Sequence, residues 1–289
     1  MIIAKLFGGL GNQMFIYAAS KGIADKASQD LYFDTRTGFK YDQFGRTFAL
    51  SQFGIKLKEA DKLKSFQYPL GRVLRRLSRM IGICIPYLNF RFLTEEIPYH
   101  YEVDFMRLPL SSSFYLEGYF QSYKYFEDIR EQLMVDFKFP NYIINSVEEE
   151  KNVITQSSFV PVAIGIRRYS EMKGQYGDLK VLNLEYYERA VEYITTVVSN
   201  PMFVVFSEDI NWVKDNLKLP YPVYFVKPKS GELSPFQDMY LMSLCSHHII
   251  SNSTFYWWGA YLASNTNHIV IAPSIFLNRD CVPNDWIII

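Results

Sequence analysis

Between residues 161 and 271, short apolar runs alternate with segments of helical spacing, and this alternation constrains the fold more than any other feature. Strands that alternate with helices at such intervals form a parallel sheet with helices on both faces. The expected helices are Leu184–Thr196, Ile210–Asn216, Phe236–Cys245 and Thr254–Leu262. The expected strands are Val162–Ile166, Met202–Phe206, Val223–Val226, His248–Ile250 and His268–Ile271.

The N-terminal segment begins in a similar way. Ile2–Phe7 is a short apolar run that ends at glycines, Gln13–Ala27 has helical spacing, and Leu31–Phe33 resembles a second strand. This order predicts a strand–helix–strand unit. Residues 119–137 predict a further helix, whereas residues 35–117 show no regular pattern.

The length of 289 residues suits two domains better than one core. We expect an N-terminal α/β domain over residues 1–150, on the acceptor side, and a C-terminal Rossmann-like domain over residues 151–289. A cleft between two such domains is the natural place for a ligand.

Composition excludes some classes of partner and some compartments. Thirty basic residues balance thirty acidic ones, which argues against nucleic acid as the main partner. The cysteines, Cys84, Cys245 and Cys281, show no zinc spacing and favour a reducing compartment. With neither a signal-like apolar region nor a run long enough to span a membrane, the expected location is the cytoplasm, including the inner face of its membrane.

One basic segment, residues 72–91, interrupts this balance. Arg72, Arg75, Arg76 and Arg79 are interspersed with apolar residues at helical spacing. One interpretation is an amphipathic helix that makes weak peripheral contact with an anionic membrane. The alternative is a helix whose apolar face packs on its own domain and whose basic face is solvated.

The sequence Gly-Gly-Leu-Gly-Asn-Gln at residues 8–13 follows the first expected strand. A glycine loop before a helix lets backbone amides approach a ligand, and the helix N-terminus favours anions. The alternative is a tight turn alone. The amides of Asn12 and Gln13 directly after the loop favour a contact with a polar ligand.

The expected strand Val162–Ile166 runs directly into Arg167 and Arg168. Ligands of open α/β folds bind at the carboxyl ends of the strands. A guanidinium matches phosphate oxygens, so one of these arginines is a candidate to hold a pyrophosphate leaving group. Solvated arginines at a strand end are the alternative.

Two more expected strands end in polar residues. Ser207, Glu208 and Asp209 follow one of them, and a carboxylate there can accept from a nucleobase or ribose. Ser207 or Asp209 alternatively caps the next helix. Asn252-Ser253-Thr254 follows the other strand and begins a helix rich in aromatic residues, which is a candidate anion site.

These segments resemble the α-1,2-fucosyltransferases of glycosyltransferase family 11, in the same order and almost from end to end. The resemblance implies a GT-B fold with two Rossmann-like domains facing across a cleft. It implies GDP-β-L-fucose as donor and inverting transfer, in α-1,2 linkage, to a galactoside-containing glycan or lipid-linked oligosaccharide in bacterial surface-glycan (O-antigen) synthesis. No metal or other cofactor is expected. The matching segments are Gly8–Phe15, Gly118–Phe126, Ile166–Arg168, Phe206–Leu217 and Asp238–Leu262.

The resemblance also implies roles for individual residues. Arg167 would hold the GDP pyrophosphate, and Asn12 would reach the reaction centre from the N-terminal domain. Tyr119 and Gln121 are candidates for the acceptor side. The implied donor-binding residues are Gly9, Gln13, Arg168, Glu208, Asp209, Asn252, Ser253, Thr254 and Phe255.

The chain departs from the family at one motif. The family usually reads His-x-Arg-Arg-Gly-Asp-Tyr, whereas this chain has Gly165 in place of the histidine and Ser170 in place of the aspartate. Glu171 is the nearest replacement for a general base, and departure of the leaving group assisted by its own phosphate is the alternative. A different donor, acceptor or linkage, or a sugar-nucleotide-binding protein without catalysis, also remains open.

Overall fold

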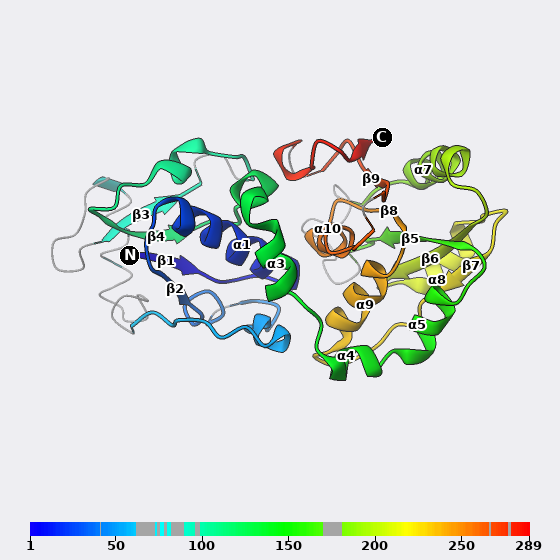
Figure 1. Cartoon of the computed structure of the whole chain (residues 1–289), viewed down its shortest axis with the longest axis horizontal. Coiled ribbons are helices and arrows are strands. Elements are labelled where there is room, and N and C mark those ends of the chain that lie inside the picture. The colour runs from blue at the N-terminus through cyan, green and yellow to red at the C-terminus, as the bar shows by residue number, and fades with distance from the viewer. Residues whose placement is uncertain are drawn as a thin grey trace. The chain divides into compact units, whose positions relative to one another are not determined.

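The computed structural model describes residues 1–40, 42–61, 73, 76, 77, 80, 81, 90–95, 99–169, 181–265, 267–276 and 279–289. Within them the chain divides into two compact units, Met1–Lys138 and Phe139–Ile289. Each unit has its own parallel sheet (Figure 1), as the alternating pattern predicted for the second unit.

The sheet of the N-terminal unit has the strand order β2-β1-β4-β3, and all its pairs are parallel. Helix α1, Leu10–Lys26, connects β1 to β2, which confirms the predicted strand–helix–strand unit. Strands β3 and β4 lie in the region where the sequence showed no regular pattern; they pair with each other, and β4 also pairs with the distant strand β1. The strands are β1 Ile2–Lys5, β2 Leu31–Asp34, β3 Phe90–Thr94 and β4 Ser113–Glu117.

The single helix predicted over residues 119–137 is wrong for its first half. Phe120 has a left-handed backbone with φ of 48°, which a continuous helix does not allow. The amides of Tyr119 and Phe120 donate instead to the Glu95 carboxylate. The short helices of this unit are η1 Leu50–Phe53, η2 Val103–Arg107, η3 Tyr123–Tyr125, η4 Glu127–Ile129 and α3 Arg130–Asp136.

The sheet of the C-terminal unit has the order β10-β9-β8-β5-β6-β7, again with parallel pairs. All five predicted strands are confirmed with small shifts at their ends. Strand β10 was not predicted, because two residues are too few to give a recognisable pattern. The strands are β5 Val160–Ile166, β6 Pro201–Ser207, β7 Val223–Phe225, β8 His247–Ile249, β9 Val270–Ala272 and β10 Ile287–Ile288.

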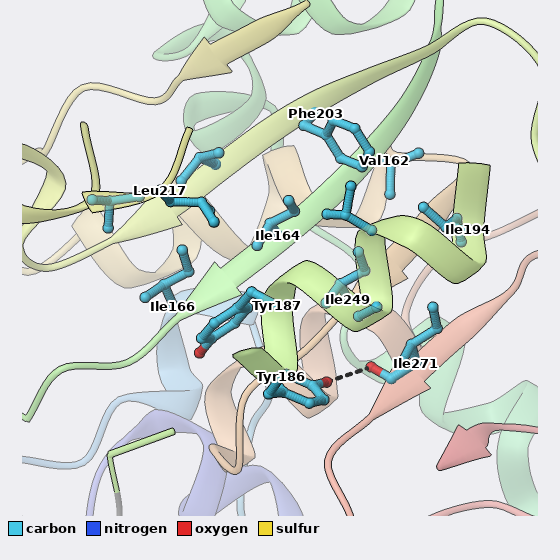
Figure 2. Packing of buried hydrophobic residues seen from close by; sticks show 14 of the residues in the cluster. Val162, Ile164, Ile166, Tyr186, Tyr187, Ile194, Phe203, Leu217, Ile249 and Ile271 are labelled. Carbon is cyan, nitrogen blue, oxygen red and sulfur yellow. Dashed lines mark hydrogen bonds between the residues drawn. The ribbon is translucent and has the colours of Figure 1, made fainter. Parts of the chain in front are cut away.

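Alternate residues of β5 face opposite sides of this sheet. Val162, Ile164 and Ile166 pack with residues of α7 and α8 in the core that Figure 2 shows. The Tyr186 hydroxyl donates to the backbone oxygens of Ile250, at 2.6 Å, and Ile271, at 3.2 Å, and so ties α7 to the sheet. The helices are α7 Leu184–Val197, α8 Ile210–Asn216, α9 Ser234–Ser243, α10 Thr254–Tyr261 and the short η6 Arg279–Cys281.

The division between the units falls before the boundary predicted at residue 150. Helices α4, Asn141–Asn145, and α5, Glu148–Thr155, pack against α9. The Gln237 side chain donates to the Ser146 hydroxyl at 2.9 Å, and Lys229 pairs with Glu150 at 3.3 Å. These contacts place the two helices in the C-terminal unit.

The basic segment 72–91 is described at seven positions. Five of them are helical and exposed; their apolar members include Val73, Leu77 and Met80, with Met80 at 75% exposure. The apolar side chains therefore do not pack on the domain at these positions, contrary to one of the two interpretations. No helix in the described part of the chain is long and apolar enough to cross a membrane.

Candidate functional site

The C-terminal sheet reverses its strand order beside β5. From β5 the chain proceeds to β6 and β7 on one side, and β8, β9 and β10 then lie on the other side. In open α/β sheets, the loops that leave the carboxyl ends of strands at such a switch point part from each other and form the ligand crevice. Arg167 and Asn252 lie on the two loops that leave this point.

Arg167 is held by a carboxylate from the neighbouring strand. Ile166 pairs with Ser207 in the sheet, so Arg167 and Glu208 follow side by side. Nη1 of Arg167 lies 3.4 Å from Oε1 of Glu208, and the same oxygen accepts from the backbone N–H of Arg168 at 2.6 Å. Glu208, predicted to lie near a guanosine, thus orients the cation that is predicted to hold the pyrophosphate.

The two arginines have different surroundings. The Arg168 guanidinium lies 3.6 Å from the ring centroid of Trp212 on α8, a cation–π distance. The Arg167 guanidinium lies 4.9 Å from the ring of Tyr169. This arrangement gives Arg168 a contact with α8 that supports the local fold, while the contact of Arg167 with an anion stays a prediction.

Tyr169 connects the two loops of the switch point. Its hydroxyl donates to the backbone oxygen of Asn252 at 3.1 Å, and its φ of 54° places it in the left-handed region. Burial raises the pKa of Tyr169, and the nearby Arg167 charge opposes that rise. The tyrosine therefore acts here as a neutral hydrogen-bond donor.

The segment Asn252–Phe255 leads into α10 as predicted. Ser253 is the N-cap of α10 and makes no side-chain capping bond. Ser251, just before it, is fully buried, and its hydroxyl has no hydrogen-bond partner among the described residues. Trp257 and Trp258 are both fully buried, so both belong to the core.

Asp209 takes the capping role that the sequence had left open. Its carboxylate accepts from the backbone N–H of Trp212 at 3.1 Å at the start of α8. Ser207 accepts in turn from the Asp209 N–H at 3.1 Å. A capping oxygen satisfies one of the unpaired amides of the helix, so Asp209 has a structural role whether or not it contacts a nucleoside.

Gly165 has a steric reason to be glycine. A Cβ atom at this position would lie 2.5 Å from the ring of Tyr256, which no real contact allows. The Tyr256 hydroxyl lies within hydrogen-bonding distance of the backbone oxygens of Ile166, at 3.2 Å, and Phe206, at 3.3 Å. Tyr256 therefore occupies the space that a histidine at position 165 would need.

The N-terminal sheet has a switch point of its own. Strand β1 lies between β2 and β4, so the chain leaves β1 towards one side and returns as β4 on the other. The loop after β1 leads to Asn12, and the loop after β4 leads to Gln121. The Gln121 side chain donates to Oδ1 of Asn12 at 2.9 Å and is almost fully buried, with 2% exposure.

Gln13 has a structural role instead of the predicted contact with the donor. Its side-chain amide donates to the backbone oxygens of Gly8, at 2.9 Å, and Thr47, at 3.0 Å. Its side-chain oxygen accepts from the Ala49 N–H at 2.9 Å, and the residue is 1% exposed. The side chain is therefore occupied in holding residues 47–49 to the start of α1.

Two residues of this unit, Glu95 and Arg46, were not predicted from the sequence. Glu95 accepts hydrogen bonds from the loop that contains Tyr119. The half-buried Arg46 approaches Gly9, the predicted donor-binding glycine, with its Nε 3.9 Å from where a Cβ would lie. Tyr119 itself packs on Phe7, with ring centroids 4.7 Å apart. Glu95 and Arg46 come from the region without a regular pattern, where no motif marked them.

Two other kinds of residue that the sequence singled out are the candidate base and the histidines. Glu171, the candidate base, and Ser170 belong to the part that is not described. His248 packs at the start of its strand, as expected, with Nε2 2.9 Å from the Met242 oxygen. No cluster of His, Cys, Asp or Glu that could hold a metal ion occurs among the described residues.

Two α/β units, each with polar groups at the switch point of a parallel sheet, define a GT-B-type fold. Solved structures with this fold include FUT1 of Arabidopsis thaliana in complex with GDP, with a TM-score of 0.53, 12% identity and coverage of 98% of this chain and 72% of that one. The NodZ α-1,6-fucosyltransferase soaked with GDP-fucose gives a TM-score of 0.50 at 12% identity and covers 90% and 91% of the two chains. The GT-B fold expected from the resemblance is thus confirmed.

The chain matches Glycosyl transferase family 11 over residues 1–281 and belongs to that family. The O-antigen biosynthesis glycosyltransferase WbnK of Escherichia coli is 29% identical over 93% of this chain and 92% of its own length. The alpha-1,2-colitosyltransferase of Escherichia coli is also 29% identical, over 99% and 98%. The galactoside alpha-(1,2)-fucosyltransferase 1 of Saimiri sciureus is 25% identical over 81% and 64%.

Proposed function

We propose that this glycosyltransferase transfers L-fucose from GDP-β-L-fucose to a galactoside hydroxyl, in α-1,2 linkage and with inversion, during synthesis of a bacterial O-antigen. The observation that carries the proposal is the family match over residues 1–281. It is supported by relatives that are named as an O-antigen glycosyltransferase and as galactoside fucosyltransferases.

In the proposed reaction, the acceptor hydroxyl oxygen forms a bond to the anomeric carbon of fucose as the bond to the diphosphate breaks. Negative charge then builds up on the departing GDP. Arg167, which follows β5 and pairs with Glu208, is our candidate for the residue that meets this charge. A preorganised cation stabilises a developing anion without reorganisation cost at the moment of reaction.

The acceptor hydroxyl must also lose its proton. Glu171 is our candidate for the base, and the departing phosphate is the alternative acceptor of that proton. With Glu171→Gln, loss of the acidic limb of the kcat/KM profile would support the carboxylate. If the pH profile of kcat/KM is unchanged in Glu171→Gln, the departing phosphate is the group that accepts the proton.

The direct test is to mix the protein with GDP-fucose and a panel of β-galactosides, and to measure GDP release and the linkage of the product. Release of GDP with an α-1,2-linked product is expected. Arg167→Ala should slow release by about 10³-fold. Arg189→Ala, a change of an exposed arginine on α7, should leave it intact. No release with any acceptor, together with no binding of GDP-fucose, contradicts the proposal.

The alpha-1,2-colitosyltransferase relative favours a second candidate donor. Colitose is fucose without the hydroxyl group at C3, so the two donors differ by one polar group. A site built to hydrogen-bond a hydroxyl rejects the analogue that lacks it, by roughly 10⁴-fold in well-studied cases. The ratio of kcat/KM for GDP-fucose and GDP-colitose therefore identifies the donor.

Binding of either donor without turnover would instead indicate a sugar-nucleotide-binding protein that has lost catalysis.

We further propose that the reaction needs no metal ion or other cofactor. The charge that a metal would supply is assigned to Arg167. Turnover should be the same after dialysis against EDTA as in added Mg²⁺ or Mn²⁺. A loss with EDTA that Mg²⁺ restores contradicts this assignment.

Weak contact between residues 72–91 and an anionic membrane surface is also proposed, since the acceptor would be lipid-linked. Val73, Leu77 and Met80 present exposed apolar side chains, and Arg76 beside them is exposed too. The protein should sediment with vesicles containing phosphatidylglycerol more than with neutral phosphatidylcholine vesicles. Met80→Glu should reduce this, and Val197→Glu, a change of an exposed residue on α7, should not.

A further inference from the structure

Glu95 lies directly after β3, at the carboxyl edge of the N-terminal sheet. Its carboxylate accepts hydrogen bonds from three backbone amides. The N–H of Tyr119 lies 2.7 Å from one oxygen, and the N–H groups of Phe120 and Tyr99 lie 2.9 and 3.3 Å from the other. One side chain thus ties the start of the segment after β3 to the loop after β4.

The loop that Glu95 holds has an unusual backbone. Phe120 has a φ of 48°, a conformation that is costly for a bulky residue and persists only where the surroundings impose it. Its buried ring packs against Phe105 and Tyr125, with centroids 5.4 and 5.9 Å away. A Cβ at Gly118 would lie 2.6 Å from Glu95, so the loop and the carboxylate fit closely together.

The next residue, Gln121, connects this loop to the first turn of α1. Its Nε2 donates to Oδ1 of Asn12 at 2.9 Å, across the switch point of the sheet. Gln121 is buried, whereas Asn12 is half-buried. The side chain of the half-buried Asn12 is therefore oriented by a residue whose own backbone position depends on Glu95.

We propose that Glu95 is a positioning residue for the acceptor half of the reaction, acting on Asn12 through the Tyr119–Gln121 loop. The inference rests on the proposed function, because Asn12 is the residue expected to reach the reaction centre from this unit. It does not depend on the donor sugar, since every residue in the chain of contacts belongs to the N-terminal unit.

A carboxylate suits this task because it only accepts hydrogen bonds, and the three backbone groups that it bonds among the described residues are donors. Burial raises the pKa of Glu95, and the three amides oppose that rise. A glutamine at this position would direct its NH₂ group at one or more of the same N–H groups. Glu95→Gln should therefore release the loop with almost no change in volume.

The test is a double-mutant cycle. Glu95→Gln should lower kcat/KM for the acceptor by about tenfold, a loss typical of a misplaced reacting group, and should leave the Kd for GDP within about twofold. If Glu95 acts through Asn12, the double variant Glu95→Gln/Asn12→Ala should be no slower than Asn12→Ala alone. Glu95→Asp, which keeps a purely accepting group, should recover part of the activity.

Asp34 provides a matched control. It is a buried carboxylate at the end of β2 that accepts from the N–H groups of Arg36 and Thr37 and from the Tyr115 hydroxyl. Asp34→Asn should lower the melting temperature as Glu95→Gln does. Its effect on kcat/KM should be small and should add to that of Asn12→Ala.

The positioning role is overturned if Glu95→Gln leaves kcat/KM for the acceptor unchanged, or if its effect adds fully to that of Asn12→Ala. A wild-type enzyme without turnover would overturn the proposed function instead. In that event, the NMR signals of the Asn12 and Gln121 side-chain amides test whether Glu95 positions Asn12. A shift with Glu95→Gln but not with Asp34→Asn supports the role, and no shift refutes it.

Discussion

The two switch points are built from different chemistry. In the C-terminal unit an arginine and a glutamate, Arg167 and Glu208, form an ion pair beside the strand ends. The N-terminal unit also has an ion pair at its strand ends, between Lys5 of β1 and Glu117 of β4 at 2.8 Å, but there the bridge between the segments that follow these strands consists of two neutral amides, Asn12 and Gln121. The carboxylate of Glu95 accepts hydrogen bonds from backbone amides. Under the proposed function, this difference assigns the anion to the C-terminal unit and the uncharged hydroxyl groups of the acceptor to the N-terminal unit.

The largest expected effect is that of Arg167→Ala. Loss of the cation that meets the pyrophosphate should lower kcat/KM by about 10³-fold, as removal of one preorganised group does elsewhere. The melting temperature should change little, because Arg167 is not part of the core. Steady-state kinetics and thermal unfolding check this, with Arg189→Ala as the control.

Gly165→Ala should destabilise the C-terminal unit without a direct effect on charge. The added methyl group would lie 2.5 Å from the Tyr256 ring, and such overpacking costs about 1–3 kcal/mol in the free energy of unfolding. Gly45→Ala is the comparison: it lies at an exposed turn with a positive φ of 65°, where an added Cβ strains the backbone but contacts no other atom. Urea unfolding of the two variants therefore compares the cost of steric overlap with the cost of backbone strain. Equal stability of wild type and Gly165→Ala would mean that Tyr256 moves away freely.

Glu208→Gln should have a smaller effect on activity than loss of the arginine itself. The guanidinium remains but loses its ion-pair partner, so we expect about a 10-fold decrease in kcat/KM and a weaker affinity for GDP. Isothermal titration with GDP separates the two units: Glu208→Gln should weaken binding, and Gln121→Ala should not. A loss of GDP affinity with Gln121→Ala would contradict the division of chemistry between the switch points.

The smallest expected effect on activity is that of His248, which contributes to the pH dependence of stability. Burial of His248, with 0% exposure, lowers its pKa to about 3. Because the unfolded chain binds this proton near pH 6.5, the histidine's contribution is complete above that pH. It is lost as the pH falls towards 3, by about 1.4 kcal/mol per pH unit. Glu95 behaves oppositely: its raised pKa favours folding at low pH and loses this effect as the pH rises.

Urea unfolding between pH 7 and 4 checks this prediction with His248→Gln. The glutamine can still donate to the Met242 oxygen, as the histidine does. The variant should lose less stability on acidification than the wild type. Parallel pH profiles for the two proteins would show that His248 is not the group responsible.

Local pattern was enough to predict much of this protein. Strand and helix ends in the C-terminal unit, the glycine loop after β1 and the arginine pair after β5 all depend on short-range periodicity or on adjacent residues. Asp209 as a helix cap likewise follows from its neighbours. These features need no knowledge of distant contacts, and the order of the motifs led to the correct family.

Only the tertiary structure decided which loops become neighbours. The pairing of β5 with both β6 and β8 joins segments far apart in the chain, and so brings Glu208 to Arg167 and Asn252 to Tyr169. Long-range pairing also places β4 beside β1, and β3 beside β4, which gives Glu95 a role that no motif indicated. Gln13 shows why sequence alone could not assign its role, since an amide next to a glycine loop is equally able to bind a ligand or other parts of the chain. Its three hydrogen bonds, formed with residues from two loops, show that its side chain binds the chain itself.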